Sequence, residues 1–324
     1  MPYMIPGEPS PRAHSHELAD FAEIQAWLKG ECSQREVQRQ QEQLDDNLES
    51  PDKHAPASFP DTEYDGIPGP EDDIEQMADY MVTELEERSN ACEAGYPFRQ
   101  SRNGNVLIFS PDNNDLEKSD IYLFLLLATR LNMKDCKVQG GHDGTLLFEA
   151  LSAKVLQNYL GASRAEGVVF GTAAGNRFKD KINDMCERLE EGGSFSNPDS
   201  ASPTKNDDAL DVVAWIPFAD RRASKLSIFA QCKTGTNWTS SKGDLRPGDF
   251  LKSWTRKGSF ALDPVRSFFV AEAIDRSRWN STVTSAGLFF DRCRIVSFAE
   301  KINPDLLAKI HEWTEAAKIS IQGS

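Results

Sequence analysis

The stretch Leu210–Lys233, LDVVAWIPFADRRASKLSIFAQCK, decides the fold of the central part of the chain. It contains two apolar segments with the pattern of strands, Leu210–Phe218 and Lys225–Lys233, joined by the short turn Ala219–Ser224. The first segment is almost continuously apolar, which is typical of a strand buried on both faces. We therefore predict a hairpin inside a sheet.

Three polar residues interrupt this apolar stretch where the hairpin would bring them together. Alternate side chains of a strand share a face, so Gln231 and Lys233 are expected to point the same way. Asp211 lies near the start of the first strand, and burial of a lone carboxylate is costly unless a partner compensates it. Because the turn is short, Asp211 is expected beside Gln231 and Lys233. The opposite face of the second strand should enter the core with Leu226, Ile228, Ala230 and Cys232.

A second acid joins the group through helical geometry. A helix is expected to begin at residues 143–145 and to end before Gly161. At 100° per residue, Glu149 shares a face with Ala153 and Leu156, so its carboxylate is turned toward protein.

Two inward-facing acids, an amide and a lysine are the groups that metal-assisted phosphodiester cleavage needs. Mg²⁺ prefers oxygen ligands and is commonly held by one or two carboxylates. The metal would activate a water molecule, and the ammonium of Lys233 would orient that water or stabilise the charge of the transition state. The structural alternative is an ion pair between Asp211 and Lys233, with Glu149 bonded to a backbone amide.

Asp211 followed by Gln231-Cys232-Lys233, after a helix that contains Phe148-Glu149, resembles the PD-(D/E)xK nuclease superfamily in its Q-x-K variant. The resemblance covers about residues 140–300 and implies a restriction-endonuclease-like α/β fold, a mixed central sheet flanked by helices. It implies that Mg²⁺ or Mn²⁺ is bound by Asp211, Glu149 and the backbone carbonyl of Cys232. It also implies that Lys233 is the catalytic lysine and that Gln231 replaces a more usual acidic ligand.

The elements around the hairpin agree with a mixed α/β domain over residues 140–324. Helices are expected at 143–160, 175–189, 250–255 and 305–318. Further strands are expected at 168–170, 267–274 and 287–298.

The N-terminal region is acidic and mostly helical in pattern. Residues 1–95 contain 23 of the 51 acidic residues and 6 of the 36 basic ones, so the rest of the chain has 28 acidic and 30 basic residues. Residues 1–70 are expected to be a peripheral acidic arm and linker, partly disordered or docked to a partner, with helices at 17–28 and 31–48. Residues 71–139 are expected to form a subdomain with a helix at 72–89, a hairpin at 98–110 and a helix at 119–131.

Several classes of protein are excluded by absent patterns. No apolar run is long enough to span a membrane, and no signal peptide is recognisable. The six cysteines are isolated, which argues against a zinc site and favours a reducing, cytoplasmic compartment. A P-loop, a dinucleotide fingerprint and a hydrolase serine motif are missing, so any dependence on ATP would require another subunit.

Basic and aromatic residues near the predicted site are candidates for contacts with nucleic acid. These candidates are Arg177, Lys179, Asn237, Trp238, Lys242, Arg292 and Arg294. Two alternatives stay open, since the cations near the start of the 175–189 helix fit a solvated face and Trp238 fits the core equally well.

The sequence thus predicts a Mg²⁺-dependent endonuclease that hydrolyses DNA, in the setting of bacterial antiviral defence or restriction that the resemblance implies. A helicase, ATPase or other defence subunit is the expected partner, no membrane is involved, and a homo-oligomer is left open. The first alternative is a catalytically silent nuclease-fold protein that binds nucleic acid or organises a complex. The second is a scaffold that acts through its acidic arm.

Overall fold

The computed structural model describes residues 13–40, 70–111, 115–171, 177–197 and 208–323. Its centre is a mixed five-stranded sheet in the order β10-β9-β8-β7-β6. The strands are β6 (Glu166–Val169), β7 (Val212–Trp215), β8 (Ser227–Lys233), β9 (Val265–Val270) and β10 (Leu288–Phe290). The predicted mixed α/β class is confirmed.

The predicted hairpin is β7 and β8, which pair antiparallel with Val212 opposite Ala230. β6 pairs antiparallel with β7, whereas β8, β9 and β10 run parallel. Every residue of β7 is buried, as its apolar sequence predicts. The strand is shorter than expected because Pro217 follows it and cannot donate a backbone hydrogen bond. Leu226 precedes β8 and is 44% exposed, so its predicted place in the core is wrong.

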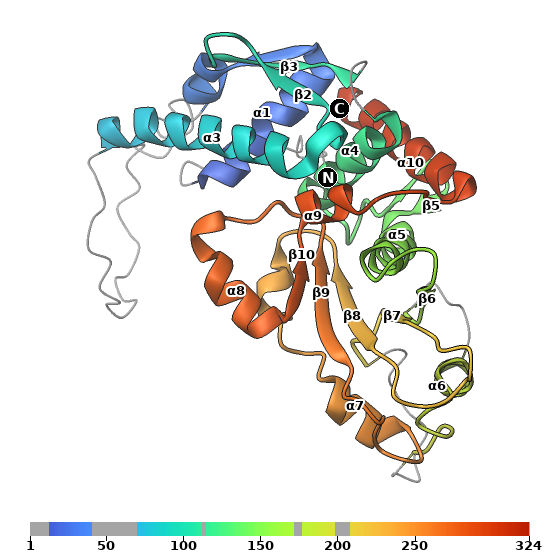
Figure 1. Cartoon of the computed structure of the whole chain (residues 1–324). Helices are drawn as coiled ribbons and strands as arrows, with labels where there is room; N and C mark the ends of the chain where they lie inside the picture. The colour runs from blue at the N-terminus through green and yellow to red at the C-terminus, as the bar shows by residue number, and fades with distance from the viewer. Residues whose placement is uncertain (1–12, 41–69, 112–114, 172–176, 198–207, 324) are drawn as a thin grey trace.

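Helices cover both faces of this sheet (Figure 1). α5 (Gly144–Tyr159) packs on the face that contains Val212, Ile228 and Ala230. The opposite face contains Val213 and Phe229, which share a separate apolar cluster with α6 (Phe178–Leu189) and α7 (Pro247–Trp254).

A layer of helices lies at one end of the sheet (Figure 1). It consists of α1 (Ser15–Lys29), α3 (Pro70–Cys92), α4 (Leu116–Arg130), α9 (Arg292–Ser297) and α10 (Pro304–Gln322). A small sheet in the order β1-β3-β2 is attached to it, with β1 (Glu31–Ser33), β2 (Phe98–Gln100) and β3 (Val106–Phe109). A two-stranded ribbon, β4 (Val138–Gln139) and β5 (His142–Asp143), leads into α5.

The helix expected at 17–28 is present as α1, but its predicted peripheral position is wrong. Leu18, Ala19 and Ile24 are fully buried, and they share one core cluster with residues of α4, α5, β8 and α10. β1 occupies residues 31–33 of the predicted 31–48 helix, whereas residues 34–40 are helical as predicted. The remainder of that helix and the rest of the predicted arm and linker up to residue 69 lie outside the described residues.

The strand predicted at 287–298 is correct only for its first part. β10 ends at Phe290, and Asp291 then caps α9 by accepting a hydrogen bond from the amide of Arg294 at 3.0 Å. The preceding helix α8 (Trp279–Ala286) was not expected, because its polar, Ser- and Thr-rich sequence has no apolar helical stripe. No described helix is both long and apolar enough to cross a membrane.

Candidate functional site

Asp211 lies at the point where β6, β7 and β8 come together. Its side chain is 8% exposed, and its Oδ2 accepts a hydrogen bond from the amide of Cys232 at 2.7 Å. Its backbone carbonyl accepts hydrogen bonds from the amides of Phe170 and Gly171, just beyond β6. The carboxylate is therefore held at the junction of three neighbouring strands, as the hairpin geometry predicts for β7 and β8.

Glu149 approaches Asp211 across Gly171. Asp143 caps the start of α5 by accepting a hydrogen bond from the amide of Thr145 at 2.9 Å, and Glu149 lies on the buried side of this helix. A Cβ atom placed on Gly171 would lie 2.8 Å from Oε2 of Glu149 and 2.9 Å from Oδ1 of Asp211. Both carboxylate oxygens thus lie beside this glycine, within 3 Å of the same Cβ position, and both residues are buried.

Gln231 and Lys233 lie at the end of β8, on the face opposite Cys232. Cys232 packs in the core with Ala230, and the alternation of the strand turns Gln231 and Lys233 to the other face. Gln231 is 1% exposed and its Oε1 accepts no hydrogen bond. Lys233 is half-buried and forms no ion pair with Asp211 or any other residue in the described part of the chain. The structural alternative of an Asp211–Lys233 ion pair is therefore absent.

The Cys232 thiol is surrounded by the charged groups of this cluster. Burial raises the pKa of this thiol well above its usual value, the carboxylates of Asp211 and Glu149 raise it further, and Lys233 lowers it. Hence all three charges act on one buried atom at the end of β8. We call Glu149, Asp211, Gln231 and Lys233 the β8-end cluster.

The β8-end cluster fits a two-carboxylate cation site better than a preformed metal cage. Among the described residues no group of three or more His, Cys, Asp or Glu side chains could hold a metal. Two carboxylates and the unpartnered amide oxygen of Gln231 are hard oxygen donors, and Mg²⁺ usually keeps several waters and uses few protein ligands. The donor set therefore suits Mg²⁺ or Mn²⁺ and lacks the nitrogen and sulfur ligands of a zinc site.

Lys181 has a role that the sequence did not indicate. It lies on α6 and is 7% exposed, and its Nζ donates to the carbonyl of Gly171 at 2.8 Å. This contact ties α6 to the glycine between the two carboxylates. Arg177 and Lys179, the two predicted phosphate contacts on the same segment, are exposed and remain candidates.

Trp238 does not have the predicted role. Its side chain is 5% exposed, it packs on Phe268 and Phe289, and its Nε1 donates to Oε2 of Glu272 at 2.6 Å. A ring buried in this way has no face for a nucleobase, so the core alternative is correct. Asn237 is exposed and Lys242 is half-buried in the same loop, and both remain candidates for contacts with nucleic acid.

The predicted contact of Arg292 with nucleic acid is also wrong, because its side chain is fully buried. Its guanidinium donates to both carboxylate oxygens of Asp20, at 2.7 and 3.1 Å, and to the carbonyl of Ala271 at 3.1 Å. Arg294 is exposed, with one donor on the carbonyl of Phe289 and its guanidinium 4.4 Å from the ring centre of Trp279. Only Arg294 of this pair can reach a phosphate.

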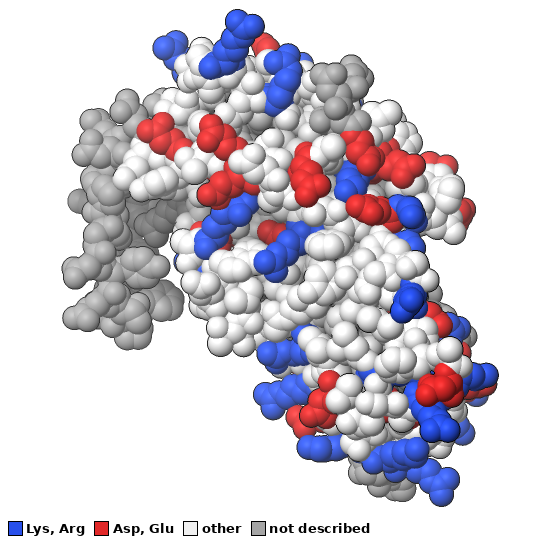
Figure 2. All heavy atoms as spheres, in the orientation of Figure 1, with Lys and Arg blue, Asp and Glu red and all other residues white. Residues whose placement is uncertain are grey.

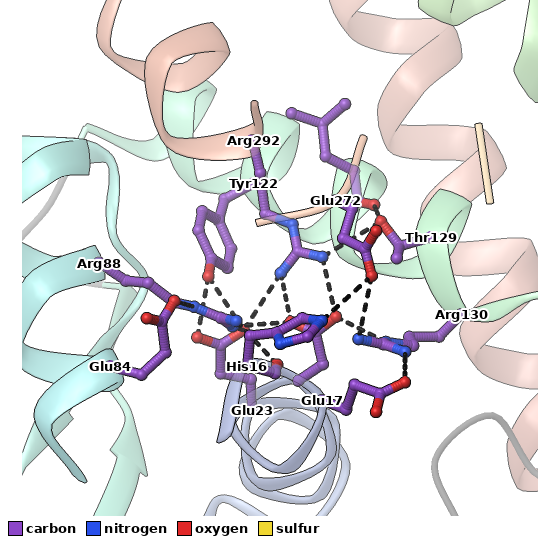
Figure 3. A network of polar contacts seen from close by, with 12 residues as sticks. His16, Glu17, Glu23, Glu84, Arg88, Tyr122, Thr129, Arg130, Glu272 and Arg292 are labelled. Carbon is purple, nitrogen blue, oxygen red and sulfur yellow. Dashed lines mark hydrogen bonds and ion pairs between the residues drawn. The ribbon is translucent and has the colours of Figure 1, made fainter. Parts of the chain in front are cut away.

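The partners of Arg292 belong to a buried network of charges between α1, α3, α4 and α9 (Figure 3). Asp20 accepts hydrogen bonds from Arg88 at 2.7 Å, from Arg130 at 2.6 Å and from Arg292. Glu23 accepts from the hydroxyl groups of Tyr96 and Tyr122, each at 2.8 Å. The network attaches the helical layer to the end of the sheet.

Comparisons with protein-family models, with curated proteins and with solved structures found no match for this chain.

Proposed function

We propose that the chain is a metal-dependent endonuclease that hydrolyses phosphodiester bonds at the β8-end cluster. The observation on which this rests is the pair of buried carboxylates, Glu149 and Asp211, whose oxygens both lie within 3 Å of where a Cβ of Gly171 would be. Two neighbouring carboxylates supply the hard oxygen ligands with which proteins commonly hold a divalent cation such as Mg²⁺.

The residues of the β8-end cluster would have two roles, metal binding and stabilisation of charge on the phosphoryl group. Asp211, Glu149 and the carbonyl of Cys232 would hold Mg²⁺ or Mn²⁺, with the free Oε1 of Gln231 as a further oxygen donor. Such an ion lowers the pKa of a bound water and neutralises negative charge on the phosphoryl group. Lys233, with no ion-pair partner in the described residues, donates to a phosphoryl oxygen and stabilises the charge that develops there.

The order of elements supports the assignment to a nuclease-like fold. In chain order α5, β6, the β7–β8 hairpin, α7 and β9 form a series of helix, strand, hairpin, helix and strand, with α6 inserted between β6 and the hairpin. The acid, the Gln and the Lys that resemble the PD-(D/E)xK pattern occupy the starts and ends of the strands that this order requires. Fold analogy alone does not establish activity, so the proposal depends on the cluster itself.

DNA is the proposed substrate because basic side chains gather near α7 on the face drawn in Figure 2. Between residues 242 and 266 the chain has three acidic residues and six basic ones, namely Lys242, Arg246, Lys252, Arg256, Lys257 and Arg266. Such a surface favours a polyanion. A defence or restriction setting with a helicase or ATPase partner follows from the resemblance alone, and is part of the proposal.

The direct test is cleavage of plasmid and linear DNA with Mg²⁺, Mn²⁺ or EDTA by the wild type and by Lys233→Ala, Asp211→Asn and Glu149→Gln. We expect metal-dependent cleavage that falls by about 10²–10³-fold or more in each variant, since each removes a group that stabilises charge in the transition state. Asp211→Asn retains an oxygen acceptor for the Cys232 amide, which protects the fold.

Lys29→Ala is the matched control, because Lys29 is an exposed lysine of α1 that pairs with Glu36 and belongs neither to the β8-end cluster nor to the basic surface near α7. It should cleave like the wild type. A metal-dependent activity that survives in all three cluster variants would place the active site elsewhere. Nucleic-acid binding without cleavage by the full chain, under every metal condition, would favour the catalytically silent alternative.

A further inference from the structure

A groove of about 510 Å³ runs beside the β8-end cluster, between α5, β6 and the start of α10. Its floor is made of small apolar residues, Ala150 and Ala153 of α5 with Gly167 and Val169 of β6. A Cβ on Gly167 would lie 2.5 Å from the carbonyl oxygen of Ala153, so the glycine allows the strand to lie directly on the helix. The floor of the groove is therefore a close contact between β6 and α5.

The groove leads to the two carboxylates. Gly167 and Val169 point to the same face of β6, and Gly171 follows two residues later, about 7 Å further along an extended chain. On the helix, Ala153 follows Glu149 by about one turn, so it lies on the same side of α5. The strand β6 and the helix α5, which together form the floor of the groove, therefore both lead to Glu149, Gly171 and Asp211.

The chemistry of the groove favours a polyanion. Lys154 and Lys301 contribute to its lining, and none of the described residues that line it is acidic. Neither ammonium forms an ion pair within the described part of the chain, and Lys154 only donates to Oε1 of Gln157 at 3.0 Å. Lys301 has a left-handed backbone with φ of 49°, an uncommon conformation for a residue with a side chain, at the edge of the groove.

We infer that this groove holds the sugar-phosphate backbone of one nucleic-acid strand next to the bond to be cleaved, with Lys154 and Lys301 on its phosphates. The inference rests on the proposed function, since the same junction supplies the reacting groups. The substrate is then a polymer that extends past the scissile phosphate along β6. A peptide strand paired with the outer edge of β6 is the competing occupant, because β6 ends the described sheet.

The test is the salt dependence of oligonucleotide binding, measured by fluorescence anisotropy with the full chain and EDTA so that no cleavage occurs. For a single-stranded 20-mer, the double variant Lys154→Gln/Lys301→Gln should lower the slope of log K against log salt by about 0.7 for each lysine. The control Lys29→Gln/Lys309→Gln removes the same charge from exposed lysines outside the groove and should keep the wild-type slope. Thermal melting checks that all variants are folded.

Hydrolysis of bis(p-nitrophenyl) phosphate with Mn²⁺ separates this inference from the proposed function. Hydrolysis by the wild type, together with equal slopes for the two double variants, would overturn the groove and leave the active site standing. A slope lowered only in the groove variant, without hydrolysis of the diester, would support the groove and count against the proposed activity. No binding of the oligonucleotide by the wild type at 50 mM salt would also overturn the groove assignment.

Discussion

Gly171 is the residue on which the candidate site depends most directly. It supplies no chemistry, but its missing side chain is the space between the oxygens of Glu149 and Asp211. Its carbonyl accepts from buried Lys181, and its amide donates to the carbonyl of Asp211. One backbone unit thus sets the separation of the two acids.

We predict that Gly171→Ala abolishes metal-dependent hydrolysis and lowers the free energy of unfolding by about 1–3 kcal/mol. The new methyl group would lie within 3 Å of both carboxylate oxygens, and overpacked sites are destabilised by about this amount. Steady-state cleavage assays and urea unfolding measure the two effects. Gly248→Ala is the control, because a Cβ there meets no atom within 4 Å. Full activity of Gly171→Ala would contradict the assignment of this junction as the metal site.

At the scale of elements, α1 is the helix whose role differs most from its sequence. Asp20 and Glu23 have the pattern of an acidic surface helix, yet both side chains are fully buried. The arginines that compensate Asp20 lie 68, 110 and 272 residues away along the chain. Helical periodicity involves only neighbouring residues and does not reveal partners so far apart in sequence. The interpretation of this segment as a peripheral arm is therefore wrong for α1.

We expect Asp20→Asn to lower the free energy of unfolding by about 3–5 kcal/mol, the usual effect of breaking a buried ion pair and leaving its partners uncompensated. Glu17→Gln should cost less than about 1 kcal/mol, because the side chain of Glu17 is 32% exposed and lies 3.4 Å from Arg130. Urea unfolding at pH 7 measures both. Equal stability of the two variants would rule out the buried network as the anchor of α1.

The difference between the wild type and Asp20→Asn should also depend on pH. Burial raises the pKa of Asp20, but Arg292, Arg130 and Arg88 outweigh it and hold the pKa well below its usual value. A lowered pKa in the folded state gives stability that is complete above the unfolded-state value of about 3.9 and is lost as the pH falls below it. The gap between the two proteins should therefore stay constant from pH 7 to about pH 5 and shrink as the pH falls below about 4. A gap that widened on acidification would contradict this sign.

At the scale of the whole molecule, one core cluster connects the N-terminal helix to the sheet and to α10. Residues of α1, α4, α5, β8 and α10 belong to the same cluster. The anionic surface that the composition predicts is visible where Asp and Glu gather near α3 and α10, whereas Lys and Arg are more frequent near α6 and α7 (Figure 2). The chain therefore separates its charges over its surface while sharing its core.

We predict that deletion of residues 1–40 prevents folding. The deletion removes fully buried apolar residues of α1, leaves Arg292 buried without its carboxylate partners and leaves Arg88 with Glu84 alone. Far-UV circular dichroism and thermal melting of the truncated chain should show no cooperative transition, whereas the single substitution Lys29→Gln should melt like the wild type. A cooperative melt of the truncated chain would mean that α1 is dispensable, as the acidic-arm hypothesis requires.

The sequence by itself determined the β7–β8 hairpin, the order of the surrounding elements and the meeting of Asp211 with the end of β8. These features depend on local periodicity and short turns, which act between neighbours in the chain. Only the tertiary structure decided that Trp238 and Arg292 are buried, that Lys181 supports Gly171 and that α1 belongs to the core. A polar or aromatic side chain has the same local pattern whether it faces solvent or a buried partner. Its environment is set by contacts between segments far apart in sequence, such as those that join Asp20 to Arg292.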